Sequence, residues 1–355
     1  MRKVAIVYDR VNKWGGAERV LLSIHEIFPD APLFTSVYDR KKALWAKVFP
    51  KVYTSFLQNI PFAKSNHEFF APLMPLAFES FDLTGFDLVI SVTSEAAKGV
   101  IVGKNTKHIC YCLTPTRYLW SHYNEYFKGL SFKVVTMPFV KYLRWWDKRA
   151  AKRPDVMIAI SNEVKNRIKK YYNRDSITIF PPVDTATTRI IVAKRKGYYL
   201  LVSRLDYGYK KVELAIEAFN RLGYSLVVVG SGREEFKLKS MSKKNIKFVG
   251  RVSEKRLSDY YRGAKALIMP QEEDFGIVSV EAQIYGVPVI AYKKGGALDT
   301  VIDGKTGVFF KEQKIESLIN AVRKFEKTKF VGDNLFANAK RFSKERFKKE
   351  IRKIL

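Results

Sequence analysis

The segment "ALIMPQEEDFGIVSVEAQIYG", residues 266–286, decides the fold class of this chain. Residues 266–270 form an apolar run that is typical of a buried strand, and residues 277–286 have the pattern of a helix that ends at a glycine. A strand that passes through a short loop into a helix is the repeating unit of a parallel sheet covered by helices. The segment therefore predicts an α/β fold.

The same alternation of strand and helix extends along the chain. Runs this rich in Val and Ile are typical of strands that helices cover on both faces. Between them lie amphipathic segments such as 212–223, which also ends at a glycine. The predicted strands are residues 3–9, 88–91, 108–113, 156–161, 198–204, 225–230, 246–250, 266–270 and 288–292.

A domain boundary is predicted near "IFPPVD", residues 179–184, because two consecutive prolines make a stiff, extended connector. Each side of it has its own series of strands and helices. We expect two doubly wound, Rossmann-like domains, 1–182 and 183–335, that face a cleft where ligands bind beyond the carboxyl ends of the strands. Ser343 is the expected N-cap of a helix near the end of the chain.

The composition indicates an anionic partner. Lys and Arg total 64 against 35 Asp and Glu, a formal net charge of +29, which suits nucleic acid, an anionic membrane surface or a phosphorylated substrate. A heat-loving source is an alternative explanation. No run reaches the roughly 18 apolar residues that span a bilayer, and "MRKVAIVYDR" at the start is typical of a buried strand rather than a signal peptide. We expect a cytoplasmic protein whose cysteines, Cys110 and Cys112, are reduced and buried.

Two glycine turns could bring backbone amides to an anion. Gly15 and Gly16 follow the first predicted strand and precede a helix, whose N-terminus would present free N–H groups. Their spacing is not the G-x-G-x-x-G of dinucleotide-binding proteins, and a tight turn without a ligand explains them equally well. Gly230 ends the strand at 225–230, where the turn could lie near a phosphate or sugar or could be structural only.

Cationic side chains follow the first strand of the second half. Arg204 ends the strand at 198–204, and Lys210 and Lys211 precede the next helix. At the carboxyl edge of a parallel sheet they could reach a diphosphate, Arg with two parallel hydrogen bonds and Lys as a point charge. A solvated basic loop is the alternative. Arg251 and Val252 come just after the strand at 246–250, at an edge where a flat base could rest.

The opening segment adds two carboxylates and a helix start. The amides of Phe275, Gly276 and Ile277 can face an anion because Gly276 lies where the helix begins. Glu273 precedes this turn and Glu281 lies one helical turn after it, and carboxylates suit sugar hydroxyls because they accept hydrogen bonds. Hydroxyl-binding groups at both ends and phosphate-binding amides between them predict a site for a nucleotide sugar.

With these motifs in this order, the chain resembles the retaining GT-B glycosyltransferases of family 4 (group 1), and especially mannosyltransferases of lipid-linked glycan or polysaccharide assembly. The signature E-x-F-G-x-x-x-x-E is met by Glu273, Phe275, Gly276 and Glu281. The resemblance covers essentially the whole chain, since it also includes the Gly-Gly-Ala-Glu turn and the segments 111–120, 141–161 and 286–310.

The resemblance implies roles for the residues of the second domain. Glu273 would bind the hydroxyls of the donor sugar and stabilise the transition state, and Glu281 would hold the ribose. Arg204 and Lys210 would neutralise the departing diphosphate. The spacing between these two cations is one residue longer than the family usually has, so Lys211 is an alternative to Lys210.

Further roles follow from the same resemblance. Gly16 would lie against the phosphates from the other domain, and Arg251 and Val252 would contact the base. Arg117 and Tyr118 would contact the acceptor. The last helix, at about 336–355, would cross back onto the first domain.

One position departs from the family pattern, because Leu113 stands where many members have a histidine that contacts the donor sugar. His108 is not a substitute, since on the same strand it would face the opposite side.

The reaction expected from the resemblance moves a hexose, with mannose from GDP-mannose favoured, to a glycan acceptor with retention of configuration. We expect no metal ion and no other cofactor, because Arg and Lys can stabilise the leaving diphosphate. A nucleotide-sugar epimerase or a phosphorylase with the same fold is the alternative enzyme. A basic nucleic-acid-binding protein is the alternative of another class, but no RNA- or DNA-binding motif is present.

The acceptor is expected to be lipid-linked. Residues 133–174 combine many cations with Phe139, Tyr142, Trp145 and Trp146, a mixture that suits the interface of an anionic bilayer. We expect peripheral binding to the inner face of the cell membrane. The alternative is that the tryptophans belong to the core and the cations form a solvated face.

Overall fold

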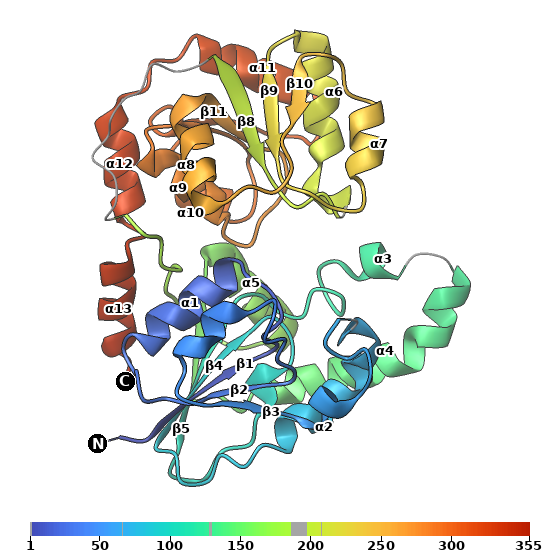
Figure 1. Ribbon diagram of the computed structural model, residues 1–355, viewed down its shortest axis with the longest axis vertical. Helices are drawn as coiled ribbons and strands as arrows, with labels where there is room; N and C mark the ends of the chain where they lie inside the picture. Colours follow the sequence, from blue (N-terminus) through green and yellow to red (C-terminus); the bar gives the residue numbers. More distant parts are fainter. Residues whose placement is uncertain (1, 66, 128–129, 186–196, 207) are drawn as a thin grey trace. The chain divides into compact units, whose positions relative to one another are not determined.

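The computed structural model describes residues 2–65, 67–127, 130–185, 197–206 and 208–355. The chain divides into two compact units, Met1–Phe180 with Lys348–Leu355, and Pro181–Phe347 (Figure 1). The boundary lies two residues before the expected one at 182/183. Residues 336–347, which we expected with the first domain, group with the second unit instead.

The first unit contains a seven-stranded parallel sheet with the order β3-β2-β1-β4-β5-β6-β7. Its strands are β1 (Val4–Tyr8), β2 (Leu33–Thr35), β3 (Val52–Thr54), β4 (Leu88–Thr93), β5 (Lys107–Cys112), β6 (Val156–Ala159) and β7 (Ile177–Thr178). Its α-helices are α1 (Gly16–His25), α2 (Met74–Glu79), α3 (Tyr123–Tyr126), α4 (Leu130–Ala150) and α5 (Asn162–Tyr172). Short 3₁₀ helices are η1 (Leu44–Val48), η2 (Phe56–Asn59), η3 (His67–Leu73) and η4 (Ala97–Gly99).

The second unit contains a six-stranded parallel sheet with the order β10-β9-β8-β11-β12-β13. Its strands are β8 (Tyr198–Val202), β9 (Leu226–Val229), β10 (Ile246–Phe248), β11 (Ala264–Met269), β12 (Val289–Tyr292) and β13 (Gly307–Phe310). Its helices are η5 (Gly208–Lys210), α6 (Val212–Leu222), α7 (Glu235–Ser240), α8 (Glu254–Gly263), α9 (Ile277–Ile284), α10 (Ala297–Thr300), α11 (Ile315–Glu326) and α12 (Gly332–Lys340), with α13 (Lys344–Arg352) passing from this unit to the first.

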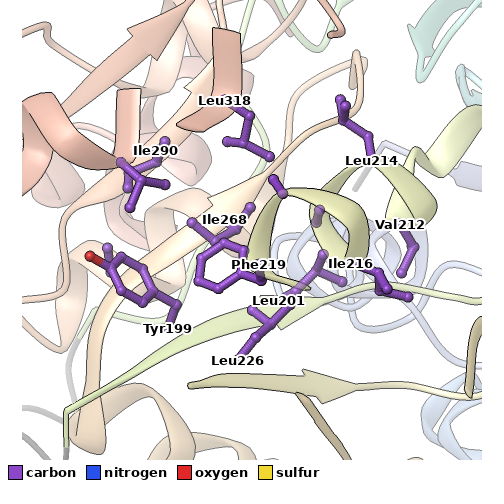
Figure 2. Packing of buried hydrophobic residues seen from close by; sticks show 14 of the residues in the cluster. Tyr199, Leu201, Val212, Leu214, Ile216, Phe219, Leu226, Ile268, Ile290 and Leu318 are labelled. Atoms are coloured by element: carbon purple, nitrogen blue, oxygen red, sulfur yellow. The ribbon is translucent and has the colours of Figure 1, made fainter. Parts of the chain in front are cut away.

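The second sheet is buried on both faces, as its Val- and Ile-rich strands predict. Alternate residues of a strand point to opposite faces, and they belong to two different apolar clusters. Leu201 and Ile268 pack with Phe219 of α6, and Figure 2 shows these side chains gathered between the helix and the strands. The neighbouring Leu200 and Leu267 pack instead in the cluster that contains residues of α8, α9 and α10.

All the predicted strands are present, with ends that differ by a few residues, and the helix predicted at 212–223 is α6 with Gly223 in the left-handed conformation at its C-terminus. The sequence did not predict β2, β3, β7 and β13, which are two to four residues long. Such short runs resemble loop segments in the sequence.

The end of the chain forms α13. Ser343 caps it, since its Oγ accepts a hydrogen bond from the Arg346 amide at 3.2 Å. Residues 348–355 group with the first unit, where Lys107 Nζ donates to the carbonyl of Ile354 at 2.7 Å. This return of the chain was expected from the resemblance.

The cysteines are both free and buried, as expected.

Candidate functional site

The order of the second sheet places one pair of loops at a topological switch point. From β8 the chain continues to β9 and β10 on one side, whereas β11 lies on the other side of β8. In doubly wound sheets, ligands bind where loops leave the carboxyl ends of two such diverging strands. The segments concerned are 203–206 and 208–211 after β8, which include η5, and 270–276 after β11, and both carry residues that the sequence singled out.

Lys210 and Glu273 meet at this point. Lys210 Nζ lies 2.6 Å from Glu273 Oε1, and both side chains are largely withdrawn from solvent, with 10% and 17% exposed. The side-chain amide of Gln271 donates to the same carboxylate oxygen at 2.9 Å. Lys211, the alternative to Lys210, is exposed and is the N-cap of α6 in the left-handed conformation, with φ of 53°. The structure therefore places Lys210, not Lys211, against the Glu273 carboxylate.

A glycine pair fixes the backbone of the Glu273 loop. The Gly296 amide donates to the Glu273 carbonyl at 2.7 Å. A Cβ atom on Gly295 would lie 2.5 Å from that carbonyl oxygen, and one on Gly296 would lie 2.3 Å from Phe275 Cα. Only glycines allow the two loops to approach so closely. This positioning role was not predicted, although both glycines belong to the segment 286–310 that carried the resemblance.

The turn into α9 lies where the sequence predicted the start of the helix. Gly276 is the N-cap of α9 with φ of 82°, a value that favours glycine. The side chain of Phe275 is buried and packs edge-on against Phe342, with ring centroids 5.4 Å apart. Phe275 therefore anchors the turn through its ring, and only its backbone is suited to an anion at the helix N-terminus. Ile277, the first residue of α9, is partly buried.

Glu281 lies on α9 with a different partner from Glu273. Tyr261 of α8 donates to Glu281 Oε2 at 2.9 Å, and Tyr261 is itself buried and stacked on Tyr285 with centroids 5.6 Å apart. The two signature carboxylates are thus held by separate sets of side chains. Glu281 is only partly buried, so its carboxylate can accept further hydrogen bonds from a ligand.

The other predicted donor-site residues lie on neighbouring loops of the same sheet. Arg204 is exposed just after β8, and Arg251 is exposed after β10. Val252 is partly buried and packs on the cluster that lies under α8. Gly230 has φ of 138°, and a Cβ atom there would lie 1.8 Å from the Ser203 carbonyl oxygen. The Gly230 turn is therefore needed for loop packing, which is the structural alternative that the sequence left open.

The first sheet has its own switch point, between β1 and β4. Gly16 begins α1 there, and a Cβ atom on it would meet nothing within 4 Å, whereas one on Gly15 would lie 3.2 Å from Glu18 Oε2. Glu18 is buried in the first turn of α1 and accepts a hydrogen bond from the Tyr8 hydroxyl at 2.8 Å. Burial and the Glu18 carboxylate together raise the pKa of Tyr8 well above its usual value. The space beside Gly16 leaves room for a ligand at the start of α1. The space beside Gly15 is limited by the Glu18 side chain of the same helix.

The Asp9 carboxylate binds a run of backbone amides at the same switch point, an arrangement that the sequence did not predict. Asp9 follows β1 and is 2% exposed. Its carboxylate accepts hydrogen bonds of 2.6–3.0 Å from the consecutive backbone amides of residues 94–97 and from Thr93 Oγ1. These amides resemble an anion-binding nest, but the protein's own carboxylate fills it.

Asp147 of α4 organises the loop that carries the predicted acceptor residues. It pairs with Lys98 at 2.5 Å, with both side chains 1% exposed. It also accepts hydrogen bonds from Thr116 Oγ1 at 3.0 Å, Trp120 Nε1 at 2.7 Å and the Tyr172 hydroxyl at 2.8 Å. Because two of these donors belong to the loop after β5, Asp147 fixes the position of that loop.

Arg117 and Tyr118 lie within this loop and are both partly exposed. Loss of hydration, reinforced by the Glu95 carboxylate, raises the pKa of Tyr118 well above its usual value. Leu113 begins the loop, and its amide donates to the Thr93 carbonyl at 2.7 Å. His108 is fully buried, its Nε2 lies 2.8 Å from Ser91 Oγ, and burial lowers its pKa to about 3. His108 is thus a neutral core residue and does not replace the missing histidine.

Helix α4 has one buried face and one exposed apolar face. Trp146 is 5% exposed, packs in the core and donates to Glu79 Oε1 at 2.7 Å. The expectation that Trp146 contributes to a membrane surface is therefore wrong. Trp145, Phe139 and Tyr142 are exposed, as expected for an interfacial surface.

Among the described residues, no group of three or more His, Cys, Asp and Glu side chains is arranged to hold a metal ion. Within the same ranges, no helix has both the length and the apolar character that crossing a bilayer requires.

Two parallel, Rossmann-like α/β units in one chain define the GT-B fold of glycosyltransferases. Solved structures share this fold over nearly the whole chain. Anabaena HepE in complex with UDP-glucose has a TM-score of 0.73 at 20% identity and matches over 99% of this chain and 98% of its own. Sucrose-phosphate synthase from Thermosynechococcus elongatus has a TM-score of 0.76 at 17% identity, over 99% of this chain and 98% of its own.

Sequence comparison identifies the second unit more closely. Residues 183–348 match the family model described as Glycosyl transferases group 1. This part of the chain is therefore similar to the group 1 glycosyltransferases. An uncharacterized glycosyltransferase of Methanocaldococcus jannaschii is 26% identical over 220 residues, which cover 59% of this chain and 62% of that protein. The match thus spans less than two thirds of that relative's length.

Proposed function

We propose that the protein transfers a hexose from a nucleotide diphosphate sugar to a glycan acceptor with retention of configuration. The observation that carries the proposal is the contact between Lys210 and Glu273 at the switch point of the second sheet. A cation and a carboxylate that can accept hydrogen bonds from hydroxyls lie side by side there, next to the helix α9 that Gly276 caps. HepE, which shares the fold, has been solved with UDP-glucose bound, and this supports a nucleotide sugar as the donor.

In the proposed reaction, the bond between the sugar C1 and the phosphate oxygen breaks. The bond to the acceptor oxygen forms on the same face of the sugar, and the departing phosphate takes the acceptor's proton. Negative charge develops on the leaving diphosphate, and fixed cations and amides stabilise it most effectively because they need no reorganisation. Lys210, Arg204 and the amides at the start of α9 would do so, while Glu273 holds the sugar hydroxyls and Glu281 the ribose.

We propose that the reaction needs no metal ion. Lys210 is already held near the site by Glu273, and a lysine can neutralise a phosphate as a point charge. Transfer that continues in the presence of a chelator is the expected result.

The epimerase and phosphorylase alternatives differ in their products. An epimerase converts the nucleotide sugar without an acceptor, and a phosphorylase needs inorganic phosphate, whereas a transferase releases the nucleoside diphosphate when an acceptor is added. Product analysis of the same donor with each addition separates the three.

The donor is identified by a thermal-shift screen of UDP, GDP and their sugars, because a ligand that binds only the folded protein raises its stability by mass action. GDP-mannose is the expected donor, and UDP-glucose is the comparison that HepE supplies.

Lys210→Met should weaken binding of the preferred nucleoside diphosphate by about tenfold or more, which corresponds to about 1.4 kcal/mol. The matched control is Lys211→Met, which removes the same charge one residue away and should leave binding nearly unchanged. Equal effects of the two substitutions would contradict the proposed site.

We further propose that the acceptor is lipid-linked and that the exposed face of α4 binds an anionic membrane surface. Val135, Phe139 and Trp145 are 70%, 54% and 58% exposed, which is unusual for large apolar side chains on one helix. Lys141, Lys148 and Arg149 are exposed on the same helix, and the Arg149 guanidinium lies 5.8 Å from the centroid of the Trp145 ring. Aromatic side chains among cations suit the headgroup region of an anionic bilayer.

Vesicle sedimentation tests this surface. The protein should pellet with anionic vesicles at low salt and much less with zwitterionic ones, because the attraction to the lipid charge is screened by salt. Replacing both Phe139 and Trp145 with Ser should reduce pelleting severalfold. Phe236→Ser is the matched control, since Phe236 is 86% exposed on α7 of the other unit. Equal pelleting of the double variant and the control would contradict the role of α4.

A further inference from the structure

Gln271 is a buried polar side chain with one group that has no partner. It comes just after β11 and is 2% exposed. Its Nε2 donates to Glu273 Oε1 at 2.9 Å, whereas its Oε1 is buried and has no hydrogen-bond partner. Buried polar atoms are paired in the great majority of cases, so an unpaired carbonyl oxygen at this depth requires an explanation.

A second glutamine in the same domain shows what full pairing looks like. Gln283 of α9 is also fully buried, and its Nε2 donates to the carbonyls of Ser279 and Thr300 at 3.0 and 2.8 Å. Its Oε1 accepts from Asn338 Nδ2 at 2.7 Å. Both polar groups of Gln283 therefore have hydrogen-bond partners within the domain, whereas only the Nε2 group of Gln271 has one.

The contacts of Gln271 also fix which end is unpaired. If the amide were turned over, its oxygen would face the Glu273 carboxylate, and two acceptors would repel each other. The same carboxylate oxygen receives Lys210 Nζ at 2.6 Å. Lys210, Glu273 and Gln271 thus form one connected cluster at the switch point, and the unpaired carbonyl oxygen belongs to that cluster.

We propose that Gln271 determines specificity for the transferred sugar, with its Oε1 accepting a hydrogen bond from one sugar hydroxyl while its Nε2 positions the Glu273 carboxylate. An amide oxygen can only accept, so its partner must donate a hydrogen. Sugar hydroxyls can donate, whereas the oxygens of an ionised diphosphate cannot. This inference rests on the proposed function and adds to it a residue that binds the transferred sugar rather than the nucleotide.

The experiment separates the sugar from the nucleotide. Binding of the preferred nucleoside diphosphate and of its sugar is measured by calorimetry with the full chain and with Gln271→Met, which keeps the length of the side chain but removes both polar groups. The variant should bind the nucleoside diphosphate within about twofold of wild type and the nucleotide sugar about tenfold more weakly, which is about 1.4 kcal/mol. Gln313→Met is the matched control, because Gln313 donates to the carbonyl of Pro270 beside the cluster, and it should leave both affinities unchanged.

Donors that lack one hydroxyl identify the partner of Gln271. One monodeoxy donor should bind wild type about tenfold more weakly than the complete donor, and the same donor should lose nothing further in Gln271→Met. Equal losses in the two proteins for every deoxy donor would overturn the inference, as would an equal weakening of nucleoside diphosphate and nucleotide sugar. Failure of wild type to bind any nucleotide sugar would overturn the proposed function and the inference with it. Thermal unfolding of each variant confirms that it is folded.

Discussion

Removal of the buried cation Lys98 is predicted to destabilise the first unit strongly. Lys98 and Asp147 are each 1% exposed and lie 2.5 Å apart. Burial alone would lower the pKa of Lys98, but the charge and hydrogen bond of Asp147 raise it above its ordinary value, so the lysine is charged in the folded protein. Lys98→Met leaves the buried carboxylate with only neutral donors. Breaking one partner of a fully buried pair costs about 3–5 kcal/mol.

The double-mutant cycle with Asp147→Asn tests the reasoning behind this magnitude. The single variant Asp147→Asn leaves the buried Lys98 charge without its carboxylate partner and should lower the free energy of unfolding by a similar amount. The double variant buries no unpaired charge. The double variant should therefore be less destabilised than the sum of the two single ones by at least about 2 kcal/mol. Urea unfolding followed by tryptophan fluorescence measures this, because Trp120 contacts Asp147. Additive effects would refute the reasoning, and the exposed Lys169→Met serves as the control that should change little.

Three further predictions follow from the fold and the site. Burial lowers the pKa of His108 from 6.5 to about 3, so the unfolded chain binds a proton that the folded protein excludes. The free energy of unfolding should therefore fall as the pH drops below about 6.5, by about 2 kcal/mol at pH 5 for this residue. Urea titrations of His108→Gln should show a shallower pH dependence. Gly230→Ala should lose about 2–6 kcal/mol, because of its positive φ and the overlap with Ser203, whereas Gly332→Ala, with nothing within 4 Å, should not lose stability in the same unfolding assay. Transfer should continue at an unchanged rate after EDTA treatment, and a loss that Mg²⁺ or Mn²⁺ restores would contradict metal independence.

The buried strands were predictable because they are short runs of mainly apolar residues. The segment 198–204 contains β8 and the segment 266–270 contains most of β11, which are central in their sheet and covered on both faces. β3 and β7 lie at the edges of the first sheet and have two or three residues, and no periodicity can be read from such lengths. β13 was missed because it has only four residues and directly follows a turn, so the sequence there resembles a loop.

The residues next to the strand–helix turn were also predictable, since Glu273, Gly276 and Glu281 are close in sequence to each other and to β11. The partners of Asp9 and Asp147 were not, because they are far away along the chain. Asp9 binds amides 85–88 residues later, and Lys210 is 63 residues from Glu273. Sequence spacing could not decide between Lys210 and Lys211 either, because that choice depends on the conformation at the start of α6.

The two neighbouring tryptophans show a similar limit. Trp145 and Trp146 are adjacent, but a helix turns about 100° per residue, so one can face the core while the other faces solvent. Composition predicted an aromatic surface on this helix, and only the packing of Trp146 against the rest of the unit showed which tryptophan belongs to it.

The most direct test of the central claim is the initial rate of sugar transfer by Glu273→Gln, measured with the donor that the binding screen identifies. The matched control is Glu272→Gln, which removes the same charge one residue earlier, from a carboxylate that lies 3.1 Å from Lys294 Nζ. If Glu273 stabilises the transition state, its variant should lose at least about 100-fold in rate while the control stays within about threefold of wild type. A folded Glu273→Gln that transfers sugar as fast as Glu272→Gln would contradict the account.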